Sequence, residues 1–229
     1  ALHNTPLTIV VLATPVHRVP EDLHNVTIVS IEPKFRSHTM QRDYTFLNWW
    51  PTPYTVDPNR GYAKVQRPYL WAVLLGSHGM NRSPLRSRLL ASCSPPECIS
   101  NKTGFRNYED FYSQARFCVQ PWGITPTRYG TFQCLNAGGI PVFFSPVNVE
   151  YNQQTWSWLF NGPWSILLNS TRAETDPTYV GQSLHAIDDV QVRTMQQTIR
   201  ASNARLADPL VGLRRATDSL RKVTDSPSI

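Results

Sequence analysis

The sequence lacks several features that would assign it to a common class. It has no apolar run long enough to cross a membrane, no amino-terminal leader segment and no internal repeat. The G-x-G-x-x-G fingerprint of dinucleotide-binding proteins is also missing, which disfavours an unrelated nucleotide-binding Rossmann protein. We therefore expect a mature or excised portion of a protein whose targeting signal lies elsewhere, and any membrane attachment through an anchor absent from this chain.

Cysteine is scarce, with four residues in 229, and no C-x-x-C pair or matching histidines mark a zinc site. We accordingly expect no metal. Cys93 and Cys98 bracket a tight Pro-Pro turn and can close a small disulfide loop. Cys118 and Cys134 fall on the central strand and helix described below, and there they read as small buried apolar residues.

Lysine is also scarce: 18 arginines stand against 4 lysines, in a chain of formal net charge +6. Arginine suits bidentate contacts to phosphate and carboxylate, and the positive charge favours acidic partners such as nucleotides or anionic polysaccharides. A solvated basic surface explains the same numbers equally well. No feature indicates nucleic-acid binding, and a hydrophobic content of 41% is that of an ordinary globular protein.

N-glycosylation sequons are more frequent than roughly the one or two expected by chance. They occur at Asn25, Asn81, Asn101 and Asn169. Together with the Cys93/Cys98 pair, they indicate the secretory pathway.

The chain is organised around the stretch from residue 115 to residue 145. An apolar strand over 115–119 is followed by a loop rich in proline and glycine. Thr125 and Pro126 form a typical helix start, Gly138 and Gly139 end that helix, and a buried strand follows over 140–145. Such a strand–helix–strand unit places the helix amino terminus at the carboxyl edge of the sheet, where backbone N–H groups suit a phosphate.

Further elements flank this unit on both sides. Strands are expected at 7–12, 26–31, 69–76 and 164–168, and helices at 84–93, 107–114, 182–206 and from 208 onward. The stretch 48–62 reads as an ordered, aromatic-rich loop. Alternating strands and helices predict an α/β domain with a mostly parallel sheet.

Several segments occur in the order found in one enzyme family. They are RPYLWAVLLGS (67–77), ARFCVQPWG (115–123), AGGIPVFFS (137–145) and PWSILL (163–168). Over roughly residues 45 to 200 the chain resembles exostosin-like glycosyltransferases, family 47. The resemblance implies a GT-B fold of two Rossmann-like lobes, in which this chain is the carboxyl-terminal lobe that binds a UDP-sugar donor. It also implies the Golgi lumen, or an extracellular location, and a role in polysaccharide synthesis.

The resemblance divides the chain into three parts. Residues 1–45 are expected to supply N-terminal strands and an interlobe segment, 46–200 the donor-binding lobe, and 201–229 a basic amphipathic helix and tail. The first part is too short for a full acceptor lobe, so another lobe or protein chain would complete the fold.

Within this lobe, six residues are expected to bind the nucleotide-sugar. They are Gly76, Arg86, Gly123, Thr127, Arg128 and Gln133. Two motif positions depart from the family: Gln133 falls where an acidic residue is expected, and Gly130 where an arginine is expected. Arg128 stands two residues before Gly130, and about 100° of helical turn per residue places it on nearly the opposite side of the helix, so that it would replace the missing arginine poorly.

Two functions therefore stay open. The chain is either a donor-binding lobe, with a UDP-sugar as substrate, a glycan as acceptor and no tightly bound cofactor, or a non-catalytic pseudo-glycosyltransferase that serves as a structural or assembly module. Whether the chain is an enzyme is undecided, and no catalytic residue is assigned.

Overall fold

A computed structural model describes two compact units, residues 1–54 with 208–229, and residues 55–207. The described residues are 67–75, 83–100, 108–122, 128–149 and 161–206, together with the backbone of three short strands in the first unit. The predicted helix from residue 208 and the loop at 48–62 lie outside them.

The first unit contains a three-stranded parallel sheet. Its strands are β1 (Thr8–Leu12), β2 (Val26–Ser30) and β3 (Leu47–Asn48), in that order. The first two were predicted from their apolar runs. The third has two residues, too few to show a periodicity, and the sequence did not reveal it.

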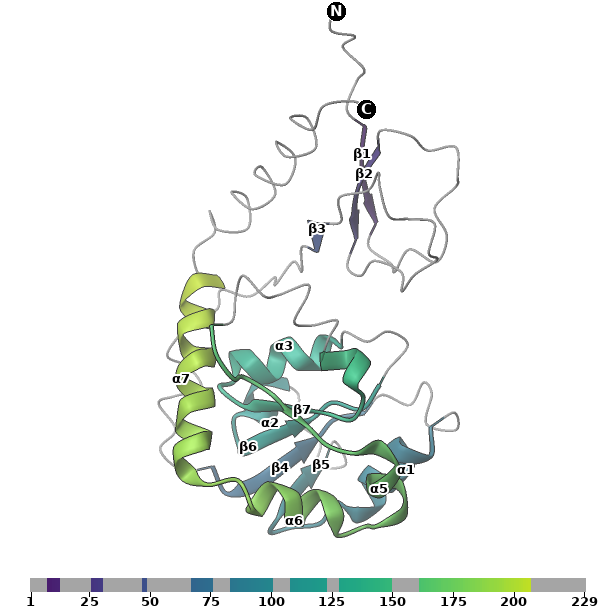
Figure 1. Cartoon of the computed structure of the whole chain (residues 1–229), viewed down its shortest axis with the longest axis vertical. Helices are drawn as coiled ribbons and strands as arrows, with labels where there is room; N and C mark the ends of the chain where they lie inside the picture. Colours follow the sequence, from purple (N-terminus) through teal and green to yellow (C-terminus); the bar gives the residue numbers. More distant parts are fainter. Residues whose placement is uncertain are drawn as a thin grey trace, which may run out of the picture. The chain divides into compact units, whose positions relative to one another are not determined.

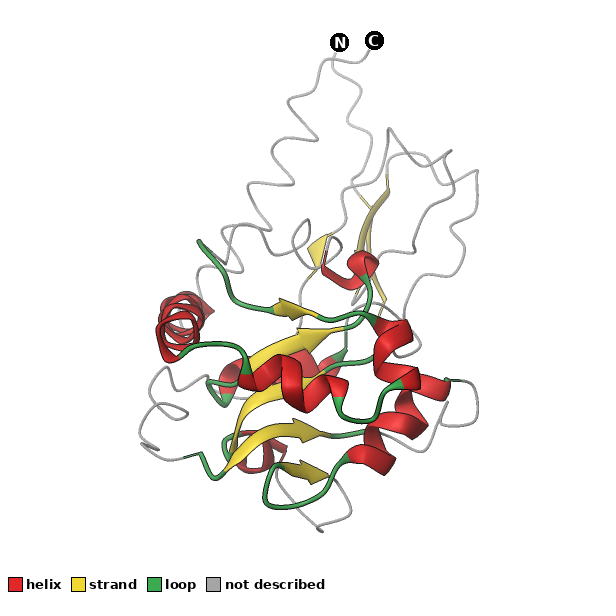
Figure 2. Cartoon of the chain, turned by 60° about the horizontal axis from the view of Figure 1, so that its bottom comes forward, coloured by secondary structure: helices red, strands yellow, loops and turns green. Residues whose placement is uncertain are grey.

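The second unit is built on a five-stranded sheet in which every pair is parallel (Figure 2). Its strands are β4 (Tyr69–Val73), β5 (Cys98–Ser100), β6 (Ala115–Val119), β7 (Ile140–Phe143) and β8 (Ile166–Leu167), in the order β5-β4-β6-β7-β8. Counted from β4, this is the order 2-1-3-4-5 of doubly wound folds. The predicted α/β fold with a mostly parallel sheet is confirmed.

Helices cover both faces of this sheet (Figure 1). They are α1 (Pro84–Ser92), α2 (Tyr108–Tyr112), α3 (Tyr129–Asn136), α5 (Ser170–Thr175), α6 (Tyr179–His185) and α7 (Asp189–Leu206). α5 contacts both α1 and α6, and α6 contacts β4, whereas α2 packs on α3, and α3 contacts β7. This division follows from right-handed crossovers, because the chain moves one way from β4 to β5 and the other way from β6 onward.

Three element boundaries differ from the predictions. Helix α3 begins at Tyr129, not at Pro126, and Arg128 precedes it with an extended backbone. The single helix predicted over 182–206 is two helices, because the chain turns between α6 and α7. Strand β5 and helix α5 were not predicted, since each is too short for its periodicity to register.

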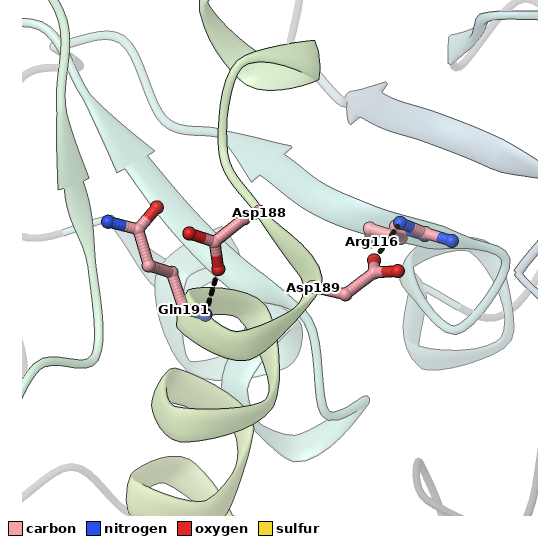
Figure 3. Close-up of polar contacts among 4 residues, drawn as sticks. All are labelled: Arg116, Asp188, Asp189 and Gln191. Carbon is pink, nitrogen blue, oxygen red and sulfur yellow. Dashed lines mark hydrogen bonds and ion pairs between the residues drawn. The ribbon is translucent and has the colours of Figure 1, made fainter.

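The start of α7 is fixed by two aspartates (Figure 3). The Gln191 backbone N–H donates to Asp188 Oδ1 at 2.7 Å, which caps the helix. Asp189 pairs with Arg116 of β6 at 3.1 Å. Both partners of that pair are exposed, so it adds little stability, while the cap explains why a new helix begins here.

Both pairs of cysteines form disulfides. The Cys93–Cys98 bond was predicted. The Cys118–Cys134 bond was not: these residues were expected to be free apolar side chains, yet β6 and α3 bring them together in the core. Disulfides persist in oxidising compartments, so this cysteine usage is consistent with the secretory pathway.

Arg67 closes the opposite, amino edge of the sheet. Its guanidinium donates to the Ala115 carbonyl at 2.7 Å and to the Ala137 carbonyl at 2.6 Å. Ala137 is the C-cap of α3, where a positive charge complements the helix dipole. Arg67 therefore holds the carboxyl end of α3, while the amino end of that helix points toward the candidate site.

The Cys118–Cys134 disulfide, called the inner disulfide below, leaves space only for glycine at position 139. A Cβ atom there would lie 2.5 Å from Cys118 Sγ and 2.9 Å from Cys134 Sγ, and neither sulfur can move away while the bond holds them. We expect Gly139→Ala to lower the free energy of unfolding by about 1–3 kcal/mol, as overpacked cores do. Urea unfolding followed by circular dichroism measures the change.

The control is the same substitution in a chain that carries Cys118→Ala and Cys134→Ala. With both sulfurs removed, the methyl group has space, so the cost of Gly139→Ala should fall clearly below its value in the disulfide-bonded chain. An equal cost in both backgrounds would contradict this explanation.

Asn169 caps a helix and also begins a sequon. It is exposed, its Oδ1 accepts the Arg172 backbone N–H at 2.9 Å as the cap of α5, and it begins a sequon. When the chain is expressed through a secretory pathway, we expect Thr171→Ala to remove the glycan and keep the cap. Asn169→Ala should remove the glycan and also cost about 1 kcal/mol of stability.

Mass spectrometry before and after enzymatic deglycosylation measures the glycan, and urea unfolding of the deglycosylated proteins measures the cap. Thr171→Ser keeps the sequon and is the matched control. An unchanged glycan mass in Thr171→Ala would refute the assignment of Asn169.

Candidate functional site at the carboxyl edge of the sheet

The sheet has one position where its strand order reverses, between β4 and β6. From their carboxyl ends, the chain leaves toward opposite sides of the sheet, through α1 after β4 and α3 after β6. Crevices at such switch points are where doubly wound folds bind ligands. The candidate site therefore lies between the residues that follow Val73 and those that follow Val119.

Arg128 lies at this edge, immediately before α3. Its Nη2 donates to the Leu74 carbonyl, just past β4, at 3.0 Å. Its backbone (φ −112°, ψ 140°) is extended, so it does not belong to the helix. The argument that helical rotation places Arg128 opposite position 130 is therefore wrong, because that rotation applies only within a helix.

Arg86 makes the reciprocal contact. It lies in the first turn of α1, which follows β4, and its Nη1 donates to the Trp122 carbonyl, past β6, at 3.3 Å. Its side chain is only 5% exposed. Arg88, two residues on, instead donates to the Glu174 carbonyl of α5 and is not part of the site. Thus Arg86, which follows β4, contacts the backbone beyond β6, and Arg128, which follows β6, contacts the backbone beyond β4.

The two guanidinium groups make the site electropositive. Burial lowers the pKa of Arg128 from its ordinary value; nearby Tyr112 opposes this effect and the positive charge of Arg86 adds to it. Burial lowers the pKa of Arg86 as well. Among the described residues, no carboxylate acts on the charge of Arg128, and its buried Nη1 has no hydrogen-bond partner there. A buried cation in this state is stabilised by a bound anion.

Position 130, where the family resemblance places an arginine, is crowded, so that any side chain there would require Tyr112 or Gln120 to shift. A Cβ atom on Gly130 would lie 2.9 Å from the Tyr112 hydroxyl and 3.0 Å from Gln120 Oε1. Gln120 is fully buried, and its Nε2 donates to the Gly130 carbonyl at 3.2 Å and to the Tyr112 hydroxyl at 3.3 Å. These contacts fix the first turn of α3 next to Arg128. With glycine at position 130, Arg128 is the residue that brings positive charge to the start of this helix.

The other predicted residues are placed as follows. Gln133 lies on the second turn of α3 and is 8% exposed. Gly76, Gly123 and Thr127 lie outside the described residues. Arg86 and Arg128, both predicted to bind the donor, lie at the same edge of the sheet, and each contacts the backbone beyond the other's strand.

Gln120 and Tyr112, which are hydrogen-bonded to each other next to the site, were not predicted from the sequence. A signal for Gln120 exists, because it is the first polar residue after the buried strand β6 and so falls at the carboxyl edge. Tyr112 carries no such signal, since its hydroxyl reaches the site only through the packing of α2 on α3.

The described part of the chain gives two further findings. It contains no group of three or more histidine, cysteine, aspartate or glutamate side chains arranged to hold a metal ion. Likewise, none of its helices combines the length and the hydropathy needed to span a bilayer.

Known proteins similar to this chain are glycosyltransferases of plants. The probable xyloglucan galactosyltransferase GT13 of Arabidopsis thaliana is 31% identical over 150 residues, which is 61% of this chain and 32% of that protein. Xyloglucan galactosyltransferase MUR3 is 31% identical over 111 residues, which is 47% of this chain and 18% of that protein. Xyloglucan-specific galacturonosyltransferase 1 is 36% identical over 74 residues, which is 32% of this chain and 10% of that protein. Both are also from Arabidopsis thaliana.

The chain spans about a third of the length of the first two curated relatives it matches. No protein-family model matches it. Among solved structures, the calicheamicin glycosyltransferase CalG4 aligns with a TM-score of 0.39 and 16% identity, over 88% of this chain and 53% of that chain, a similarity too low to extend the fold argument. The relatives confirm the coarser part of the resemblance: over part of its length, this chain is homologous to glycosyltransferases.

Arg128 gives a test that separates a binding role from a structural one. Methionine has a similar length but no charge, so Arg128→Met removes a buried cation that repels Arg86 and loses one hydrogen bond. In buffer without polyvalent anions, we expect the free energy of unfolding to rise by about 1 kcal/mol, as when buried charges are replaced by apolar groups. Urea unfolding measures it.

Pyrophosphate should then raise the urea midpoint of the wild-type chain and leave that of Arg128→Met unchanged. Arg193→Met, on the exposed side of α7, removes the same charge away from the site and should keep the pyrophosphate response. A loss of more than about 1 kcal/mol in Arg128→Met without anions would instead assign Arg128 a structural role.

Proposed function

We propose that residues 55–207 form the donor-binding lobe of a glycosyltransferase and hold the diphosphate of a nucleotide-sugar between Arg86 and Arg128. The observation that carries this proposal is the pair of buried guanidinium groups at the switch point, one of which has a buried, unpartnered nitrogen. A diphosphate supplies negative charge to both guanidinium groups and an acceptor oxygen for Arg128 Nη1.

The same arrangement suits the transfer step. An acceptor hydroxyl oxygen bonds to the anomeric carbon of the donor sugar, the bond from that carbon to the diphosphate breaks, and the diphosphate leaves with the electron pair. Negative charge grows on the leaving group during this step. Two positive groups already fixed in a buried site stabilise that charge without having to reorganise.

The named relatives and the disulfides support a specific donor, acceptor and cellular location. Since similar proteins are named xyloglucan galactosyltransferases, we propose UDP-galactose as the donor and a xyloglucan-like glycan as the acceptor. A second lobe, in the same protein or a partner chain, would complete the GT-B fold and bind the acceptor. Two disulfides and the sequons support the Golgi lumen or the extracellular space as the location.

Calorimetric titration of the chain with UDP tests donor binding. We expect micromolar affinity for the wild-type chain and a loss of about 10- to 100-fold in Arg128→Ala, which removes a charge-assisted contact worth about 1.5–3 kcal/mol. Arg193→Ala changes the net charge equally and should bind like wild type. If millimolar UDP gives no binding heat or thermal shift, the donor-lobe proposal is wrong.

The second candidate is a non-catalytic module that keeps the fold. Gln133 favours it, because a neutral amide stands where the family resemblance places a carboxylate. The two candidates differ in one measurement on the full protein with its second lobe. An active enzyme releases UDP from UDP-galactose in the presence of xyloglucan, whereas a non-catalytic module releases none above the level of Arg128→Ala.

A further inference from the structure

Trp122 is exposed, and its backbone carbonyl accepts a hydrogen bond from Arg86. Its side chain is 40% exposed, while Pro121 beside it is buried and Gln120 before that is fully buried. Three other large apolar residues are exposed in the described part of the chain, Tyr108, Leu167 and Val190. Of these exposed residues, Trp122 accepts a hydrogen bond from Arg86 through its backbone carbonyl.

We propose that the indole of Trp122 is a stacking platform for a flat ring of the ligand whose diphosphate lies between Arg86 and Arg128. This inference rests on the proposed donor binding and adds a recognition element to it. The shared chemistry is a planar or flat-faced ring joined to a diphosphate, which a nucleobase and a pyranose both provide. We assign the nucleobase, because every base presents a π face and stacks on tryptophan without a precise hydrogen-bond pattern.

The backbone around Trp122 is held firmly, so its exposure does not come from a loose end. The Gln120 N–H donates to the Val142 carbonyl at 2.8 Å, which continues the pairing of β6 with β7 one residue past the strand. Arg86 then holds the Trp122 carbonyl from the other side at 3.3 Å. An aromatic ring carried on a fixed backbone loses little conformational entropy when a ligand stacks on it.

Arg86 also sets the distance between the two halves of the proposed site. Its guanidinium binds the Trp122 backbone through Nη1 and lies close enough to Arg128 for their charges to interact. The aromatic residue and the electropositive centre are thus adjacent through a single side chain. A ligand with a flat group and a diphosphate matches that adjacency, whereas a free phosphate uses only one half of it.

The test compares three ligands by calorimetry on the full chain: pyrophosphate, UDP and UDP-galactose. For Trp122→Ala we expect UDP to bind at least about tenfold more weakly, as for loss of one base–aromatic stack, and pyrophosphate to bind within about twofold of wild type. Trp122→Phe keeps a ring and should recover most of the UDP affinity. Val190→Ala, which removes exposed apolar surface on α7, should bind all three ligands like wild type.

The other outcomes overturn the assignment in distinguishable ways. A loss seen for UDP-galactose but not for UDP would move the stack from the nucleobase to the sugar ring. Equal losses for pyrophosphate and UDP would show that Trp122 only positions Arg86, and unchanged binding of all three would remove it from the site. If the wild-type chain binds none of the ligands, the donor proposal itself fails; should Trp122→Ala not fold, Trp122→Leu against Trp122→Phe gives the same comparison.

Discussion

The parallel pairing of β4 with β6 determines the candidate site. Both strands end at the same edge, and the loops that follow them lead to helices on opposite faces of the sheet. Arg86 and Arg128 each bond to the backbone beyond the other strand, so neither contact exists unless these two strands are neighbours. Removal of this one pairing would separate the two charges and the aromatic residue beside them, although each residue would remain in the sequence.

The two buried arginines destabilise the folded protein locally. Burial lowers the pKa of both arginines, and the charge of Arg86 lowers that of Arg128 further, so their charged forms oppose folding. The surroundings hold the arrangement in place: Gln120 fixes the first turn of α3, the inner disulfide ties that helix to β6, and Arg67 holds its far end. The destabilised centre is small, and the structure around it is strongly restrained, which is the usual distribution in a binding site.

The sequence predicted the long apolar strands well. It predicted poorly those features, such as a helix start, that depend on tertiary contacts of a few residues. Strands β4, β6 and β7 were evident from continuous apolar runs, and their alternation with helices gave the parallel sheet. The start of α3 was placed three residues too early, because Thr125 and Pro126 form a good local cap, while the observed start depends on tertiary contacts of Gln120 and Gly130. That error alone led to the wrong side of the helix for Arg128. The reciprocal arginine contacts depend on strand order, which local patterns do not encode.

Gly139 and the disulfide beside it have a consequence for the history of this family of sequences. The two sulfurs occupy the space in which any side chain at 139 would stand, so positions 118, 134 and 139 form one unit. A homologue that gains a side chain at 139 and keeps both cysteines is destabilised by the overpacking, whereas one that has lost the bridge is not. Substitution at these three positions should therefore be correlated across an alignment, and an intermediate that carries both the bridge and the larger residue should be rare.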